Sequence, residues 1–515
     1  MKKRILAILF ALVLFASAFS LFSCRTNDAG GENNGESKNG SESELVNDSE
    51  SEKKEESETE DNRLVFEVGE ELDYNARDFV VLGYNWGHSE FGDTQSNNKG
   101  SVVDKALITR DSYVESYLNV KFKIKQESGQ WGDATKYAEN AYNSIYSGTH
   151  AYDLICAYSM VPSILTYKGV LYDLGSDTLA GGGTNYVDYT KAWWPEFLIN
   201  NLKVNDKIYS ISGDASTELL FNLMVVMFDE AALEVNHIDA QTLYEAVNNG
   251  EWTLDYMLDL VKGLSKDNGD GIWDINDFYA ISSYDTIAFS GFYFGTGNRL
   301  VENKDVRMVV SETIISNKAT AVFETIWGAV NTSHAIRYCD GENRYLIESG
   351  NALFELGIMS QLGNILNTRE DIGMLPFPTY GENEEYLTLV ANTHSHFCIP
   401  IDAVDASASS AVLETLGYAS YETVTPIVYE NVMKMRYSKD PESSRMFDII
   451  RAGAVTDAGI LNYFNFTANS CPDPLSMFRN AVHGESNSWV SIYEGRYKNG
   501  METTLNKLNE FYLIG

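Results

Sequence analysis

Oxygen-bearing side chains recur near the middle of the chain at the spacing of a calcium-binding loop. In the segment KDNGDGIWDIND, residues 266–277, they are Asn268, Asp270, Asp274 and Asp277. Carboxylate and amide oxygens at these positions, with a glycine at the turn, are typical of an EF-hand loop. However, Lys266 stands where the first carboxylate belongs, and the last residue is Asp rather than the longer Glu. Two interpretations stay open: a structural calcium site, or a turn whose Asx side chains accept backbone N–H groups.

The acidic residues do not mark a catalytic site. With 74 Asp and Glu residues, carboxylate pairs occur throughout the chain, so type alone identifies no glycosidase pair. The sequence lacks GxSxG, HExxH and P-loop motifs, and Gly295-Thr296-Gly297 lacks the third glycine of a dinucleotide-binding loop. We therefore expect a protein that is not an enzyme and requires no cofactor.

Two histidines, His394 and His396, lie two residues apart in a predicted strand. This spacing directs both imidazoles to one face, but no third ligand accompanies them and a metal site is not favoured. A position beside a ligand or a hinge is one interpretation. Two ordinary surface histidines are the simpler one.

The first 24 residues have the order of an export signal. Lys2, Lys3 and Arg4 precede an apolar run over residues 5–19, which is shorter than the roughly 20 residues that span a bilayer. Leu21-Phe22-Ser23-Cys24 resembles a bacterial lipobox, although Phe22 is bulkier than usual. The resemblance implies that residues 1–23 are a signal peptide and that Cys24 carries a lipid, such as palmitate. The protein would then be anchored to the extracellular face of the cell membrane of a monoderm bacterium.

Residues 24–62 are predicted to form a disordered acidic linker after the lipidated cysteine. Residues 25–62 include 13 acidic and 4 basic residues and only two sizeable apolar ones, too few to repay the entropy of folding. The formal net charge is −36 for the chain and −30 for residues 63–515. A field of this sign repels nucleic acid and anionic headgroups, so we exclude both as partners, and the lipid would be the sole membrane contact.

Four further cysteines have no metal-site spacing. They are Cys156, Cys339, Cys398 and Cys471. They could form up to two disulfides or stay as buried thiols, and the sequence leaves both open.

Strands and helices are predicted to alternate in the first ordered part. Strands are expected at residues 79–82, 120–124 and 154–157, the second with one solvated face. Between the last two, an apolar stripe predicts a helix that Asp133 caps and that ends before Gly148. This order is typical of a parallel α/β lobe, in which ligands bind at the carboxyl ends of the strands.

A second α/β stretch is predicted from about residue 219 to residue 378. Helices are expected near residues 254–264 and 319–330, and strands near 306–310 and 352–356. Thr253 is the predicted N-cap of the first helix, and Trp252 can pack on Met257, so structure explains Trp252 better than ligand binding does. After Pro400 the chain is predicted to be largely helical. A length of 515 residues favours two lobes.

Several short segments follow one another along the chain in a characteristic order. They are Tyr152-Asp153-Leu154, Gly169-Val170-Leu171-Tyr172-Asp173-Leu174, Trp193-Trp194, Asp206-Lys207-Ile208-Tyr209, Gly250-Glu251-Trp252-Thr253-Leu254-Asp255 and Gly373-Met374-Leu375-Pro376-Phe377-Pro378. Their order, over residues 73–455, resembles that of the extracellular solute-binding lipoproteins of bacterial ABC importers (family 1), which include maltose-binding protein. The resemblance implies an α/β, two-lobed periplasmic-binding-protein-like fold (class II), in which lobes joined by crossing hinge segments close on a ligand.

The resemblance also implies a division of the chain and a set of ligand contacts. Lobe 1 would comprise residues 63–210 plus about 394–455, and lobe 2 about 211–393 plus 456–515. The candidate contacts follow predicted strand ends and the first hinge segment; they are Trp86, His88, Glu90, Tyr158, Asp214, Glu218, Tyr284 and Asp285, with Phe289 nearby.

The implied function is capture of a small solute for transport. The protein would be a monomer that passes its solute, with an oligosaccharide favoured, to the transmembrane permease subunits of an ABC importer. An aromatic content of 12% suits stacking on sugar rings but also suits large cores. A surface-anchored carbohydrate-active enzyme (glycoside hydrolase or lyase) and an adhesin stay open as alternatives.

Overall fold

The computed structural model describes residues 61–85, 90–92, 101–283, 286–338, 345–429, 441–484 and 486–514. The chain divides into two units, Met1–Val65 and Phe66–Gly515. In the first unit, the described part is the short turn η1 (Asn62–Leu64), where the Asp61 carboxylate accepts the N–H of Arg63. Cys24 and the signal segment lie outside the described residues, so export and lipidation stay predictions.

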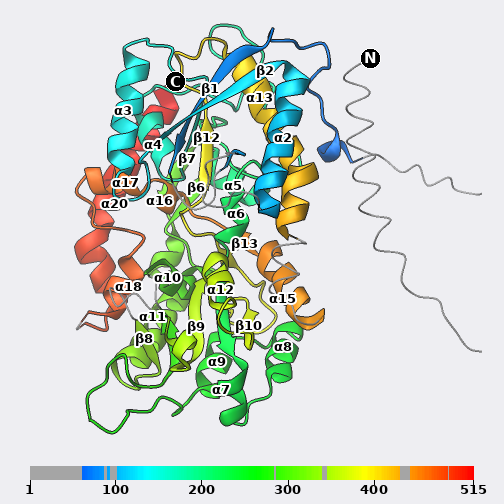
Figure 1. Ribbon diagram of the computed structural model, residues 1–515. Helices are drawn as coiled ribbons and strands as arrows, with labels where there is room; N and C mark the ends of the chain where they lie inside the picture. Colours follow the sequence, from blue (N-terminus) through cyan, green and yellow to red (C-terminus); the bar gives the residue numbers. More distant parts are fainter. Residues whose placement is uncertain are drawn as a thin grey trace, which may run out of the picture. The chain divides into compact units, whose positions relative to one another are not determined.

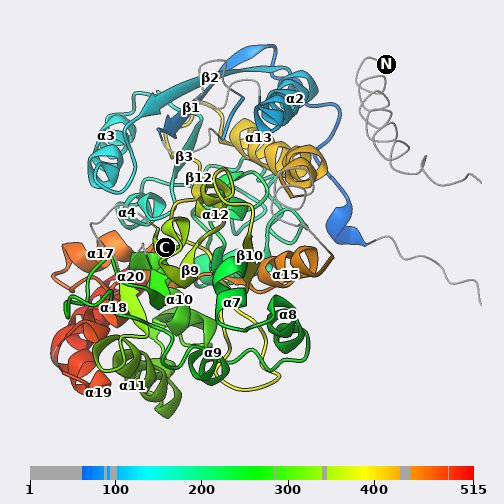
Figure 2. The same ribbon diagram turned by 60° about the horizontal axis from the view of Figure 1, so that its bottom comes forward.

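One sheet of the second unit has four strands in the order β12-β3-β1-β2. They are β1 (Arg77–Tyr84), β2 (Val120–Glu127), β3 (Leu154–Tyr158) and β12 (Ser395–Cys398). β1 is parallel to β2 and β3, whereas β12 is antiparallel to β3. Figures 1 and 2 show α2 (Val102–Leu118) and α13 (Ala406–Ala419) on one side of this sheet, and α3 (Ala134–Tyr146) and α4 (Val161–Tyr167) on the other. This cover explains why β1 is apolar on both faces, while the edge strand β2 alternates.

The other large sheet has five strands in the order β10-β4-β9-β5-β8. They are β4 (Met224–Asp229), β5 (Tyr279–Ser283), β8 (Ile336–Tyr338), β9 (Ala352–Ile358) and β10 (Ile372–Leu375). β5 is parallel to β8 and β9, and β4 is antiparallel to β9 and β10. Its helices are α7 (Glu230–Val235), α8 (Ala240–Asn248), α9 (Leu254–Leu260), α10 (Thr286–Gly295), α11 (Asn317–Asn331) and α12 (Met359–Ile365). A separate hairpin consists of β6 (Val301–Lys304) and β7 (Arg307–Val310).

The chain after the last long strand is largely helical, as predicted. Its helices are α15 (Pro441–Ala452), α16 (Ala458–Leu461), α17 (Tyr463–Ala468), α18 (Met477–Val482), α19 (Trp489–Ile492) and α20 (Lys498–Ile514). The remaining elements are α5 (Glu196–Leu202), α6 (Glu218–Phe221), β11 (Thr388–Leu389), β13 (Ala454–Val455), η2 (Glu312–Ile315), η3 (Leu346–Ser349), η4 (Ser420–Val424) and η6 (Tyr493–Tyr497). Over the described residues, no helix is both long and apolar enough to cross a bilayer.

Two helix ends test the predicted capping. Thr253 caps α9, since its hydroxyl oxygen accepts the N–H of Tyr256 at 3.1 Å, although this helix ends at Leu260 rather than at Leu264. Gly148 follows α3 with a φ of 62°, as expected of a residue in the left-handed region after a helix. The prediction for Asp133 is wrong, because its carboxylate makes no cap bond and instead accepts the hydroxyl of Ser128.

The described cysteines are thiols. Cys156, Cys398 and Cys471 are free and buried, which agrees with the thiol interpretation for these three. Cys339 lies outside the described residues.

Candidate functional site

Two crossing segments connect the two large sheets. The first, residues 209–223, leads into β4, and the second, residues 389–394, leads into β12. They run side by side, because Leu223 pairs with Val390 and the N–H of Ala391 donates to the carbonyl of Asn222 at 2.8 Å. β1 and β3 also direct their carboxyl ends to this region. Open α/β sheets bind their ligands at such strand ends, which makes this junction the candidate site.

Glu90 fastens the loop after β1 to the first crossing segment. Its carboxylate accepts the hydroxyl of Ser216 at 2.8 Å and the N–H of Thr217 at 2.6 Å. Ser216 in turn accepts the N–H of Ser395 from β12. Burial raises the pKa of Glu90, and these hydrogen bonds partly oppose the rise. With 6% of its surface exposed, Glu90 is a buried group that links the loop to the crossing segment. It is not presented to a ligand.

The other described candidates are also enclosed. Tyr158 is buried, and its hydroxyl accepts a hydrogen bond from the amide nitrogen of Asn392 in the second crossing segment. Glu218 is buried and accepts from Asn222 at 3.3 Å. Glu90, Tyr158 and Glu218 thus gather around the two crossing segments. Asp214 lies apart from them.

Asp214 points toward the helical region after α13. It accepts the hydroxyl of Thr425 at 2.5 Å, and burial raises its pKa to about 6. Trp86, His88, Tyr284 and Asp285 lie outside the described residues, so their role stays a prediction.

His394 and His396 are fully buried. The interpretation as surface histidines is therefore wrong, and the placement at a hinge agrees with the structure. They point to the same face, as their spacing predicted, and their Nε2 atoms lie 3.1 Å apart. The strand could not be recognised as buried from the sequence, because α4 and the first crossing segment cover it from elsewhere in the chain.

The acidic loop at residues 266–277 forms a network of turns. Asp277 is buried, and its two oxygens accept the N–H groups of Asn268 and Asp274. Asn268 and Asp270 likewise accept the N–H groups of residues two positions further along. Over the described residues, no group of three or more His, Cys, Asp and Glu side chains is arranged to hold a metal ion. The network has the geometry of the Asx-turn interpretation, and the calcium interpretation is left to experiment.

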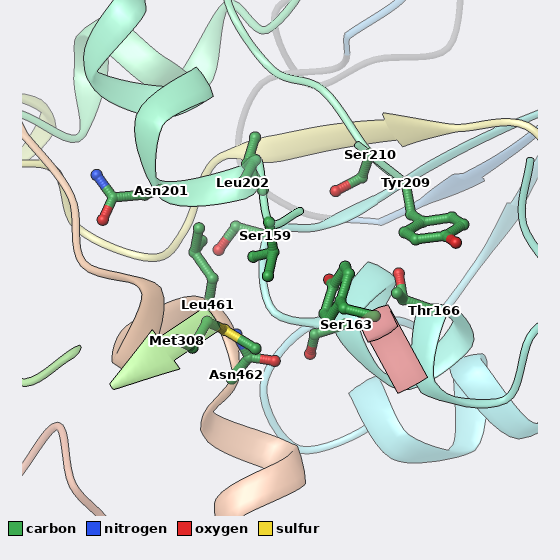
Figure 3. A pocket seen from close by; sticks show the side chains of 12 residues that line it. Ser159, Ser163, Thr166, Asn201, Leu202, Tyr209, Ser210, Met308, Leu461 and Asn462 are labelled. Atoms are coloured by element: carbon green, nitrogen blue, oxygen red, sulfur yellow. The ribbon is translucent and has the colours of Figure 1, made fainter. Parts of the chain in front are cut away.

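A polar pocket opens beside the first crossing segment (Figure 3). Its cavity volume is about 30 Å³, room for only a few water molecules. Hydroxyl and amide side chains contribute its polar lining; they are Ser159, Ser163, Thr166, Asn201, Ser210 and Asn462. Its other lining residues are apolar or tyrosine. A pocket with hydroxyls and amides but no charged side chain suits a neutral polar ligand.

Solved structures of bacterial binding proteins share this architecture. The cyclic alpha-maltosyl-1,6-maltose binding protein from Arthrobacter globiformis has a TM-score of 0.52 at 13% identity, over 85% of this chain and 99% of that one. UgpB from Mycobacterium tuberculosis, in complex with glycerophosphocholine, has a TM-score of 0.50 at 12% identity, over 84% and 98%. UspC from M. tuberculosis has a TM-score of 0.50 at 11% identity, over 84% and 100%. The chain has the two-lobed fold of solute-binding proteins. No protein-family model and no curated protein matches its sequence.

In the two-lobed fold, the crossing segments are the hinge between the lobes, and residues that face the opposite lobe near strand ends are candidate contacts. Trp131 lies beyond a strand end against a helix of the C-terminal region, and the sequence reasoning missed it. It follows the carboxyl end of β2, keeps 45% of its surface exposed, and lies 4.6 Å from Tyr463 of α17 between ring centroids. A tryptophan in the Ser-Gly-Gln turn after a predicted strand was the available signal.

Two other predicted aromatic positions belong to the core of the two-lobed fold. Phe289 is fully buried in α10 and packs edge-on against Tyr338. Trp252 is buried and donates its indole N–H to the carbonyl of Pro376 at 3.0 Å, which confirms its structural role. Phe289 is therefore explained by packing rather than by ligand contact.

Proposed function

We propose that the chain is the extracellular solute-binding lipoprotein of an ABC importer. It captures a neutral oligosaccharide between its two lobes and delivers it to the permease. The observation that carries this proposal is the two-lobed fold with a polar, uncharged pocket at the hinge. The similar structure from Arthrobacter is by its title a binding protein for a cyclic maltose derivative, which supports a sugar as the solute.

The exposed aromatic surface supports the same class of solute. Sugar rings present C–H faces that stack on aromatic side chains, while their hydroxyls bond to serine, threonine and asparagine. Trp131 and Tyr463 offer the aromatic surface, and the pocket offers the hydroxyls and amides. In this proposal the chain acts as a binding protein, so the solute would leave unaltered.

The proposal includes the location of the protein. A lipid on Cys24 and a flexible acidic linker would keep a monomeric binding domain near its permease, which raises the effective concentration of captured solute there. The alternative, a surface glycoside hydrolase or lyase, would use the same location but would change the glycan.

The proposal is tested by titrating neutral oligosaccharides, linear and cyclic, while recording tryptophan fluorescence and analysing the glycan afterwards. We expect saturable binding with the glycan recovered intact. Trp131→Ala should weaken binding about tenfold, or ~1.4 kcal/mol, through loss of stacking. Tyr146→Ala is the matched control, since Tyr146 is 75% exposed at the opposite end of α3.

Each contrary outcome has a distinct meaning. Release of shortened or unsaturated sugars would show that the protein is a carbohydrate-active enzyme rather than a binding protein. Binding of a charged solute, with no neutral glycan bound, would retain transport and reject the proposed solute. An equal effect of both substitutions would remove Trp131 from the site.

A further inference from the structure

His394 and His396 form a hydrogen-bonded chain that joins the two hinge segments. The Nδ1 atom of His394 lies 2.8 Å from the carbonyl oxygen of Ala391. The Nε2 atoms of the two rings lie 3.1 Å apart, and Nδ1 of His396 lies 3.5 Å from the hydroxyl of Ser210. Ser210 belongs to the first crossing segment and Ala391 to the second, so these hydrogen bonds span the hinge.

The partners fix the protonation of both rings. A carbonyl oxygen can only accept, so His394 carries its proton on Nδ1 and has a bare Nε2. His396 must then donate from its Nε2, and its Nδ1 is the acceptor that faces Ser210. All of these hydrogen bonds form with both imidazoles neutral. An added proton would reverse or break at least one of them.

Hydrogen bonds between uncharged groups hold the second crossing segment and β12 in place beside the rings. The hydroxyl of Ser212 donates to the carbonyl of Ser395, and the hydroxyl of Ser159 donates to the carbonyl of Asn392, both at 2.6 Å. Neither imidazole is exposed. A charged ring in this position would lose its hydration without gaining an opposite charge.

The titratable groups on the surrounding elements do not supply that charge. They are Tyr84 on β1, Cys156 and Tyr158 on β3, Tyr167 on α4, Cys398 on β12, Glu90 in the loop after β1, and Tyr209, Asp214 and Glu218 on the first crossing segment. The carboxylate of Asp214 is directed to the hydroxyl of Thr425. Burial raises the pKa of Tyr84, Cys156 and Cys398, so these stay neutral. The carboxylate of Glu90 accepts from Ser216 and Thr217, and that of Glu218 from Asn222. Over the described residues, neither imidazole is hydrogen-bonded to a carboxylate.

Burial lowers the pKa of His394 to about 4 and that of His396 well below its usual range. In an opened hinge, water would reach the rings and their pKa values would return toward about 6.5. Protons therefore bind the open arrangement better than the closed one between these values. The packed arrangement is fully favoured above about pH 6.5 and loses stability as the pH falls toward 4.

We propose that the His394–His396 pair is a proton-sensitive latch of the hinge, which holds the crossing segments together when neutral and separates them when it takes up a proton. The latch acts on the lobes themselves and does not depend on which solute the protein binds.

The test uses the purified chain without solute. Hydrogen exchange of residues 390–398 and small-angle scattering are recorded between pH 7.5 and 4.5, with exchange corrected for its intrinsic pH dependence. Exchange in the wild type should rise at least about tenfold between pH 6.5 and 4.5 as the radius of gyration grows. In the double variant His394→Asn, His396→Gln, whose amides can bond but do not titrate, both should stay constant.

Two controls keep the outcome decisive. His237→Asn removes an exposed histidine at a φ of 58°, which asparagine tolerates, and should retain the wild-type response. Nitrogen-15 spectra of the wild-type imidazoles at pH 7 should show the Nδ1–H form of His394 and the Nε2–H form of His396. An acid response that survives in the double variant, a wild type without one, or a cationic imidazole at pH 7 would each overturn the latch.

Discussion

Glu414 shows how one buried carboxylate can organise a lobe. It lies on α13 and accepts the indole N–H groups of Trp193 at 3.0 Å and Trp194 at 2.9 Å. It also accepts the N–H of Asp188 at 3.2 Å. The tryptophan pair stands out in the sequence, but its partner lies 220 residues away from Trp194. No local pattern could have identified it.

The protonation of Glu414 should make stability depend on pH. Burial raises its pKa from 4.5 to about 8, and the three hydrogen bonds only partly oppose this. Its contribution is fully present below about pH 4.5 and is lost as the pH rises through 8. Between these values the free energy of unfolding should fall by up to about 5 kcal/mol, relative to Glu414→Gln, which cannot ionise.

Urea denaturation at a series of pH values measures this difference. Glu384→Gln is the control, because Glu384 is exposed and pairs with Lys318 on the surface, and it should follow the wild-type curve. A Glu414→Gln curve parallel to the wild type would show that the carboxylate stays ionised inside the lobe.

The sequence predicted which residues lie at the hinge better than it predicted what their side chains do there. Glu90 and Tyr158 follow predicted strands, and the structure places them at the junction. Their side chains face inward, however, since Ser216 and Asn392 arrive from the crossing segments to bond them. Such burial depends on contacts between distant segments, which spacing within one strand does not encode.

At the scale of elements, local patterns were sufficient where the cause is local. The apolar run of β1, the alternation in β2 and the cap of α9 were all predicted from neighbouring residues. Asp133 was not, because Ser128 in the preceding loop competes for its carboxylate. The crossing segments were harder still, since they are irregular and their partners lie on the other segment.

Thr253 and Asp133 provide a matched test of capping. Thr253→Ala should lower the free energy of unfolding by about 1 kcal/mol, because it removes the bond to the N–H of Tyr256. Asp133→Ala should lower it by less than about 0.5 kcal/mol, because the bond it removes is to an exposed serine. Chemical denaturation of both variants decides this, and equal losses would mean that Asp133 caps α3 in solution.

The loop at residues 266–277 makes a prediction about calcium. Asp277→Ala should destabilise the fold by about 2 kcal/mol with or without calcium, because it leaves the N–H groups of Asn268 and Asp274 without their acceptor. Thermal denaturation of the wild type should be unchanged by millimolar calcium or by a chelator. A calcium-dependent rise in melting temperature that Asp277→Ala abolishes would instead establish a structural ion.

For the whole molecule, the two-lobed architecture was predicted from the order of segments, and the similar solved structures confirm the fold. The contacts of α20 with the β6–β7 hairpin and with the first crossing segment were not predicted. Asn509 of α20 bonds both backbone groups of Met308 in β7, at 2.9 and 2.8 Å. The same helix bonds Asn205 through the carbonyl of Tyr512, and its Phe511 packs on Tyr209 of the first crossing segment. α20 therefore braces the β6–β7 hairpin against the start of the hinge.

This brace should couple the unfolding of the lobes. The double variant Phe511→Ala, Tyr512→Ala removes the aromatic contacts with Tyr209 and should cost about 3 kcal/mol. Scanning calorimetry should show one cooperative transition in the wild type and two partly resolved transitions in the variant, because the lobes would then melt separately. Leu513→Ala is the control, since Leu513 is 41% exposed on the same helix, and it should retain a single transition. If the double variant melts at a lower temperature but in one transition, the hinge segments alone suffice to couple the lobes and α20 contributes only stability.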